Sequence, residues 1–238
     1  MTAPRDRPPD AAGMRRVMPA QAEGSDEEAG EGLEQRPAGD GTPDFAEAVR
    51  RLRRRAEDYG IRVKVERLGP DTPGRFDGLS ITSNETYGPA ETYYYLAHAL
   101  GSVVRWSLDP DPWRAMFEEL DAAKANRHGD PVRLERALER YRAYEDGASE
   151  YAVWLLQDLG MAAVVPPYNN FGRADIESMV EYHRTGRQPV WRDFFARWNA
   201  EVARGERQVL PYVPRPVPPF RPAPMRPQEI RQEQGETP

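Results

Sequence analysis

The uneven distribution of aromatic residues and prolines along the 238 residues is what most constrains the fold of this chain. Residues 1–43 contain no Phe, Tyr or Trp, and their nine acidic residues outnumber five arginines. Such a segment buries too little apolar area to offset the entropy lost on ordering, so we expect a disordered tail. Residues 205–238 hold nine prolines in 34 residues, which is typical of an extended, polyproline-type segment. We expect this second tail to be disordered as well.

The residues between these tails, 44–204, are therefore expected to form one domain. A domain of roughly 160 residues buries about two-thirds of the surface of its unfolded chain, which is enough for a core. The absence of cysteine excludes disulfides and thiolate metal ligands. No apolar run reaches membrane-spanning length and no signal peptide is recognisable, so we expect a cytoplasmic protein without membrane contact. The net charge of −6 argues against direct binding of nucleic acid.

Hydrophobic periodicity within 44–204 predicts a helix-dominated α+β domain. Asp44 is expected to cap a helix that ends near Gly60. Two short strands should follow, over 61–68 and 76–84, and they form a small two- to three-stranded sheet near the N-terminal side of the domain. Further helices are expected over 89–106, 109–129, 131–159, 173–185 and 190–203, and Pro166-Pro167 should break the chain before the fourth of them.

The helix expected over 89–106 has the layout of a zinc-peptidase helix. A working H-E-x-x-H motif places two imidazoles at i and i+4 on one face, with the Glu as general base. Here His98 occupies the first position, Ala99 the position of the base, and Ser102 that of the second imidazole. His98 points away from the apolar side of its helix, so we expect this face to line a cleft or to meet water.

On the helix expected over 131–159, Glu145 interrupts an apolar stripe between Tyr141 and Ala148. A carboxylate on a buried stripe is costly unless it is paired, protonated or bound to metal. The alternatives are that Glu145 swings out into solvent along its own stem or pairs with an arginine of a neighbouring helix. A single helical histidine is likewise more often a packing residue than a ligand, and we expect this of His183.

The order of these segments resembles the ImmA/IrrE family of zinc metallopeptidases. In that family a strand ending in Asn precedes a helix x-x-x-L-A-H-E-x-x-H, and a helix E-x-x-A-x-x-F-A-x-x-L-L comes later. The matching segments here are 79–84, 94–102 and 145–156. The resemblance implies a zincin-like fold over roughly 45–160, with His98 as the first zinc ligand and Glu145 as the third. The H-E-x-x-H motif itself is degenerate, at Ala99 and Ser102.

The resemblance implies that the peptidase site is lost, because both the base and one ligand are missing. Two ligands would hold zinc only weakly, so no cofactor is expected. The chain would then act as a non-catalytic regulatory or protein-interaction module, whose partner is a transcription regulator because family members act on DNA-binding repressors. The alternative is a divergent zinc-dependent metallopeptidase with a metal site rebuilt from His98, Glu145 and either Glu91 or His183. A purely structural domain, with an accidental resemblance, is the third hypothesis.

Overall fold

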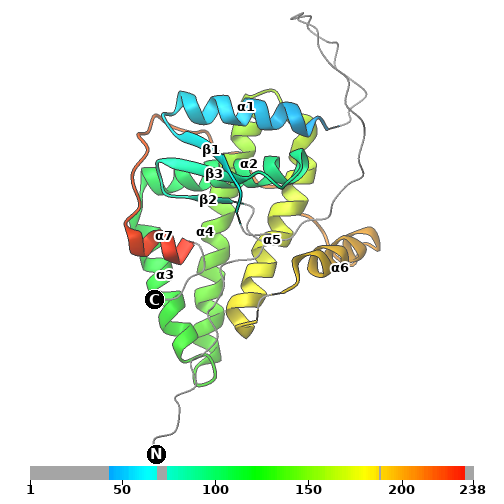
Figure 1. Cartoon of the computed structure of the whole chain (residues 1–238). Helices are drawn as coiled ribbons and strands as arrows, with labels where there is room; N and C mark the ends of the chain where they lie inside the picture. Colours follow the sequence, from blue (N-terminus) through cyan, green and yellow to red (C-terminus); the bar gives the residue numbers. More distant parts are fainter. Residues whose placement is uncertain (1–42, 69–73, 188, 234–238) are drawn as a thin grey trace, which may run out of the picture.

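The computed structural model describes residues 43–68, 74–187 and 189–233 (Figure 1). Except for Pro43, the predicted N-terminal tail therefore lies outside the described residues. Helices dominate the structure and accompany a small sheet, which confirms the predicted α+β class. The helices are α1 (Phe45–Asp58), α2 (Pro89–Leu108), α3 (Asp111–Ala125), α4 (Pro131–Asp158), α5 (Val165–Thr185), α6 (Trp191–Ala203) and α7 (Pro227–Glu233), with a 3-10 turn η1 (Ala162–Val164) before α5.

The sheet has three strands, β1 (Arg62–Glu66), β2 (Gly74–Phe76) and β3 (Ser80–Asn84), in the order β1-β3-β2. The central strand β3 pairs parallel with β1 and antiparallel with β2, and all five of its residues are buried. The single strand predicted over 76–84 therefore contains the last residue of β2 and all of β3. Gly78 separates them, because its φ of +83° suits the tight turn between β2 and β3.

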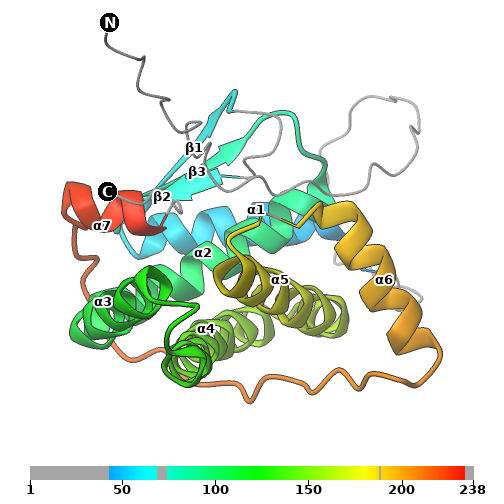
Figure 2. The same ribbon diagram turned by 90° about the horizontal axis from the view of Figure 1, so that it is seen from below.

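Helix α2 lies at the centre of the domain, with α1 and the sheet on one side and α4 on the other (Figure 2). As a result, α2 is buried on opposite faces, at Tyr93 on the apolar side and at His98 and Ser102 on the polar side. Of the two alternatives expected for the polar face, a cleft or contact with water, the second is therefore wrong for His98 and Ser102. A helix enclosed by neighbours buries its polar side chains as well as its apolar ones, which periodicity alone does not reveal.

The predicted break at Pro166-Pro167 is also wrong, because these prolines lie in the first turn of α5. The first N–H groups of a helix have no intrahelical acceptor, so proline costs little there and its fixed φ favours the helix. The helix predicted over 173–185 consequently begins at Val165. Its start is tied to the central helix, where the Tyr93 hydroxyl donates to the Val164 carbonyl at 2.5 Å.

The Pro-rich segment 206–226, which we call the strap, differs most from expectation. Predicted to be disordered, it crosses the outer side of α4 and returns to the sheet, where α7 follows (Figure 2). Tyr212 is buried and packs against Gly172, under the guanidinium of Arg173 at 4.0 Å from the ring centroid. Met225 is buried near the far end. These anchor residues among the prolines supply the apolar burial that composition alone fails to predict.

Backbone hydrogen bonds hold the far end of the strap. Trp106 Nε1 donates to the Ala223 carbonyl at 3.0 Å, and the Ala223 N–H donates to Ser107 Oγ at 3.1 Å. Two residues further on, the Met225 N–H donates to the Asp77 carbonyl at 2.9 Å. The strap thereby joins the end of α2 to the turn between β2 and β3.

The carboxylate of Glu229 on α7 fixes the end of the strap. It accepts hydrogen bonds from Arg114 Nε at 2.9 Å, from Arg226 Nε at 2.7 Å and from the Arg226 N–H at 2.6 Å. Burial alone would raise the pKa of Glu229, but these hydrogen bonds hold it below its ordinary value. The ionised carboxylate therefore stabilises the docked strap.

Replacing Glu229 with Gln should lower the free energy of undocking the strap at neutral pH by about 2 kcal/mol, because the charge-assisted bonds to two arginines are lost. In the parent, this contribution is present above the ordinary pKa of glutamate, about 4.3, and disappears as the pH falls through the lowered pKa. Hydrogen exchange of the Ala223 and Met225 N–H groups measures both effects. Arg231→Ala, at an exposed position of α7, is the control and should leave exchange unchanged. Equal protection in the Gln variant would contradict the assigned role.

Candidate functional site

The crossing of α2 and α4 brings together the two residues expected to face each other. His98 Nε2 and Glu145 Oε2 lie 3.7 Å apart, although 47 positions separate them in the sequence. Their side chains are 10% and 11% exposed. Glu145 therefore neither swings out into solvent nor stands isolated on its stripe. An imidazole and a carboxylate at this distance and burial form the candidate site.

Small residues at the crossing allow this approach. A Cβ on Gly101 of α2 would lie 2.3 Å from the Ala148 carbonyl and 3.1 Å from both the Cβ and the backbone nitrogen of Ala152 on α4. Real Cβ atoms do not approach a backbone oxygen so closely, so only glycine permits the observed contact. Gly101 follows His98 by three residues and Ala148 follows Glu145 by three. This close contact of the two backbones therefore lies about one turn from the pair.

Arg105, two turns beyond His98, holds α4 beside Glu145. Its Nη1 donates to the Tyr144 carbonyl at 2.5 Å and approaches the Ala143 carbonyl at 3.4 Å, and its guanidinium lies over the Tyr144 ring at 4.1 Å. Gly147 makes room for it, because a Cβ there would meet Arg105 Nη1 at 1.6 Å. Arg105 lies on the same face of α2 as His98, seven residues further on, but the sequence analysis did not identify this role. The glycine inside the long helix was the available signal.

The donors at the crossing do not fit a catalytic zinc ion. Ser102, one turn beyond His98, carries a hydroxyl instead of an imidazole. The buried Ala99 has no group that could act as a base. Across the described ranges no three His, Asp or Glu side chains lie where they could share a metal ion. A catalytic zinc ion usually takes three protein ligands and a water, and this pair supplies two.

The two residues proposed to complete a rebuilt site are engaged elsewhere. Glu91 Oε2 accepts the Gly88 N–H at 2.7 Å and so caps the N-terminus of α2. His183 near the end of α5 is 3% exposed and packs against the rings of Tyr141 and Tyr182, with centroids 5.1 and 5.2 Å away. This position agrees with the packing role expected for His183.

Burial lowers the pKa of His183 to about 3, and the charges of Lys124 and Arg127 act in the same direction. Neither ring nitrogen has a hydrogen-bond partner within the described part of the chain. Below the ordinary pKa of about 6.5, the unfolded chain therefore binds a proton that the native state does not.

The free energy of unfolding should consequently fall by about 2 kcal/mol between about pH 8 and about pH 5 because of His183 alone. His183→Leu removes the titrating group and the unpaired nitrogens, so we expect a flatter pH dependence and higher stability at the acidic end. Urea denaturation at both pH values measures the difference. The exposed His128, replaced with Leu, is the control for loss of a histidine at the surface and should change the stability at pH 8 by less than about 0.5 kcal/mol. An identical slope for parent and His183→Leu would contradict the prediction.

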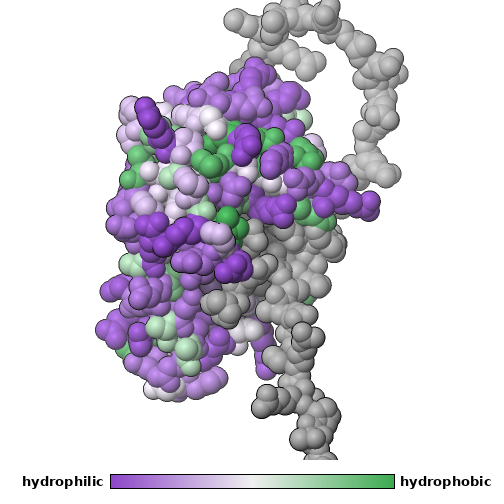
Figure 3. Space-filling view, turned by 60° about the vertical axis from the view of Figure 1, so that its left-hand side comes forward, coloured by the Kyte–Doolittle hydropathy of each residue, from purple (hydrophilic) through white to green (hydrophobic). Residues whose placement is uncertain are grey.

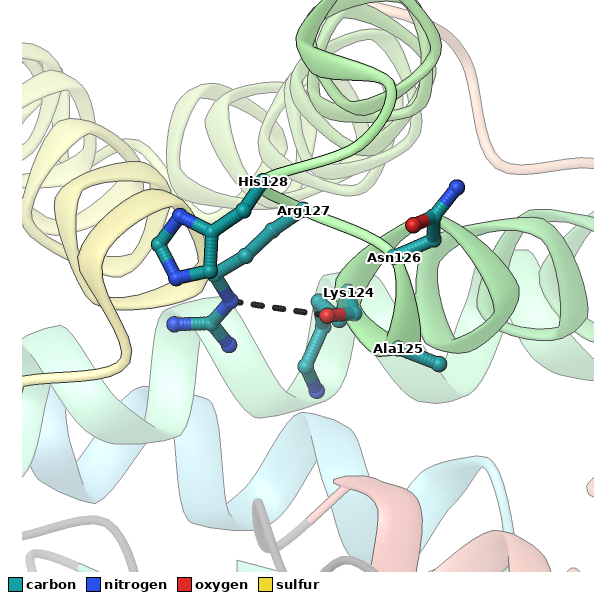
Figure 4. A pocket seen from close by; sticks show the side chains of 5 residues that line it. All are labelled: Lys124, Ala125, Asn126, Arg127 and His128. Carbon is teal, nitrogen blue, oxygen red and sulfur yellow. Dashed lines mark hydrogen bonds between the residues drawn. The ribbon is translucent and has the colours of Figure 1, made fainter.

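A shallow pocket of about 300 Å³ lies at the turn between α3 and α4 and is lined by residues 124–128 (Figure 4). Its cations already have structural partners. Lys124 Nζ pairs with Asp121 at 3.2 Å, and Arg127 Nε donates to the Lys124 carbonyl at 3.4 Å. The Arg127 guanidinium also lies where a Cβ of Gly186 would be, at the C-terminus of α5, where a positive charge is favourable. We therefore assign these side chains to the packing of the turn.

Comparison with models of known families, with curated proteins and with solved structures found no match for this chain. Among the residues that the structure describes, no helix combines the length and the apolar character needed to cross a membrane. Hydrophilic residues predominate on the face seen in Figure 3, with hydrophobic residues in patches between them.

Proposed function

We propose that this chain is an ImmA/IrrE-like, zincin-like domain that has lost its peptidase site and acts as a non-catalytic regulatory or protein-interaction module. The observation that carries the proposal is the 3.7 Å approach of His98 to Glu145. These are the two residues that the resemblance assigns as first and third zinc ligands. Their meeting across two helices is what a retained scaffold requires.

The other two positions of the motif, Ala99 and Ser102, account for the proposed loss of activity. Hydrolysis by a zinc peptidase requires a metal held by three ligands and a base that takes the proton of the bound water. Ala99 carries no ionisable group, and the hydroxyl of Ser102 does not replace an imidazole as a zinc ligand. The retained pair then serves to hold α2 and α4 together.

For the partner, we propose a protein of the transcription machinery, because members of the family that the chain resembles act on DNA-binding repressors. The net charge of −6 supports contact with a protein rather than directly with nucleic acid. A cytoplasmic location is part of the same proposal.

The alternative function is a divergent zinc-dependent metallopeptidase that uses His98 and Glu145 with a further ligand. The same pair favours it, because two donors already converge there. Zinc content separates the two functions. Stoichiometric zinc in the purified parent, lost on His98→Ala, would support the peptidase and overturn the non-catalytic proposal.

Repair of the motif tests the scaffold. Ser102→His places a second imidazole one helical turn from His98 and should convert the pair into a set of three ligands, so we expect zinc binding at least about tenfold tighter than in the parent. Adding Ala99→Glu restores the full H-E-x-x-H pattern. Isothermal titration with zinc measures the affinity, and the thermal midpoint without metal shows whether each variant folds.

His98→Ala in the Ser102→His background is the matched control, since it keeps the new imidazole but removes the first ligand. Tight binding in Ser102→His and its loss in the control would support the proposed scaffold. A folded Ser102→His variant that binds no more zinc than the parent would overturn the proposed kinship.

A further inference from the structure

The burial of the strap repeats every three residues. Pro214, Val217, Phe220 and Ala223 are half-buried against the body of the domain. Two other edges of the strap are exposed: Val213, Pro216 and Pro219 lie on one, which ends at the half-buried Pro222, and Arg215, Pro218 and Arg221 lie on the other. A repeat of three is the period of a polyproline II helix, the conformation that such a proline content favours. One edge of the strap thus faces the domain and two face solvent.

Contacts at several points hold the strap in this extended form. The Arg215 N–H donates to the Glu150 carbonyl at 3.2 Å, and the Arg215 guanidinium pairs with the Glu150 carboxylate at 2.8 Å. The ring of Phe220 meets the Tyr59 ring edge-on, with centroids 4.9 Å apart. Together with the anchors at Tyr212 and Met225, these contacts order the strap and leave Pro216, Pro218 and Pro219 exposed. Val213 remains 72% exposed.

The two solvent-facing edges carry the spacing Pro216-x-x-Pro219-x-Arg221. Protein grooves that recognise Pro-x-x-Pro segments are lined by aromatic side chains and exploit the low entropy of the preformed polyproline helix. Arg221 is exposed, and among the described residues it forms no ion pair, so its charge is available to a partner. Arg215, by contrast, is held by Glu150.

We propose that the strap is a preordered docking ridge for a protein whose groove is lined by aromatic rings and has a carboxylate at one end. Pro216 and Pro219 would insert between the aromatic rings, and the carboxylate would pair with Arg221. The edge through Pro214, Val217 and Phe220 stays on the domain, so docking does not require the strap to detach. Because the strap is already ordered, less conformational entropy is lost on binding than for a free peptide. This inference goes beyond the non-catalytic function proposed above and does not depend on His98 or Glu145.

The test uses the full chain and, as the probe, a purified SH3 domain that selects Pro-x-x-Pro-x-Arg peptides. We expect the full chain to bind it several-fold more tightly than a synthetic peptide of residues 211–222, because the ordering is already complete. Pro216→Ala with Pro219→Ala should weaken binding by about tenfold or more, and so should Arg221→Glu. Pro211→Ala, an exposed proline outside the motif, is the matched control and should bind like the parent.

Titration calorimetry gives the affinities, and hydrogen exchange at Ala223 and Met225 shows that each variant keeps the strap docked. Binding of the peptide but not of the full chain would overturn the proposal, because the docked strap would then be masked. Unchanged affinity in the double proline variant would overturn it as well. Neither result would alter the zinc titrations, so the failure of this inference is distinguishable from that of the proposed function.

Discussion

Gly101→Val is expected to destabilise the domain by about 4 kcal/mol or more, a large part of the total stability of an ordinary domain. A Cβ at this position would meet the Ala148 carbonyl at 2.3 Å, and both groups belong to helix backbones that cannot rotate away. Relief requires α2 and α4 to separate, which also opens the contact between His98 and Glu145. Urea denaturation gives the free energy of unfolding, and near-ultraviolet circular dichroism reports the loss of aromatic packing.

Gly88→Ala is the matched control for this prediction, since it alters a glycine at the N-cap of the same helix. There the added Cβ would meet only the carboxylate of Glu91, at 3.4 Å, so we expect a cost below about 1 kcal/mol. A Gly101→Val variant as stable as Gly88→Ala would show that the helices do not cross as closely as described.

His98→Leu is the second substitution with a large expected effect. It leaves the Glu145 carboxylate buried without the imidazole, and removal of one member of a buried pair costs about 3 kcal/mol or more. Glu145→Leu should cost a similar amount, because it leaves the imidazole buried without the carboxylate. The double variant should recover most of this loss, because apolar side chains often replace a buried pair without a net cost. Denaturation of the four proteins gives a coupling energy of about 2 kcal/mol or more.

Glu139→Leu tests whether these effects reflect burial rather than any loss of a glutamate from α4. Glu139 is exposed on that helix, so its replacement should change stability by less than about 0.5 kcal/mol. Strictly additive costs for His98→Leu and Glu145→Leu would show that the two side chains do not interact, and the candidate site would lose its physical basis.

Local patterns in the sequence predicted most of the secondary structure. The Asp44 side chain accepts the Glu47 N–H at 2.9 Å and caps α1 as expected, and the long helix predicted over 131–159 is α4. Glu145 could be singled out because a carboxylate on an apolar stripe contradicts helical periodicity unless something near it compensates. That signal is local, even though the compensating partner is distant in the chain.

Features set by tertiary contact could not be predicted. Nothing near Gly101 in the sequence indicates that the carbonyl of Ala148 would lie against it. The burial of His98 similarly requires α4, which covers a face of α2 that reads as polar. For the strap, overall composition outweighed the few anchor residues, Tyr212 among them, whose pockets are built from helices far away in the sequence.

The return of the strap to the sheet has a consequence for how the molecule is made. The turn at Asp77–Gly78 and the indole of Trp106 contact Ala223 and Met225, which leave the ribosome more than a hundred residues later. At roughly 5 to 20 residues per second, this delay lasts about 6 to 30 seconds, during which these surfaces are incomplete. Contacts so distant in sequence also slow the search for the native state. We therefore expect the domain to reach its final form only after the strap has been translated, because the turn between β2 and β3 is completed by contacts with Ala223 and Met225.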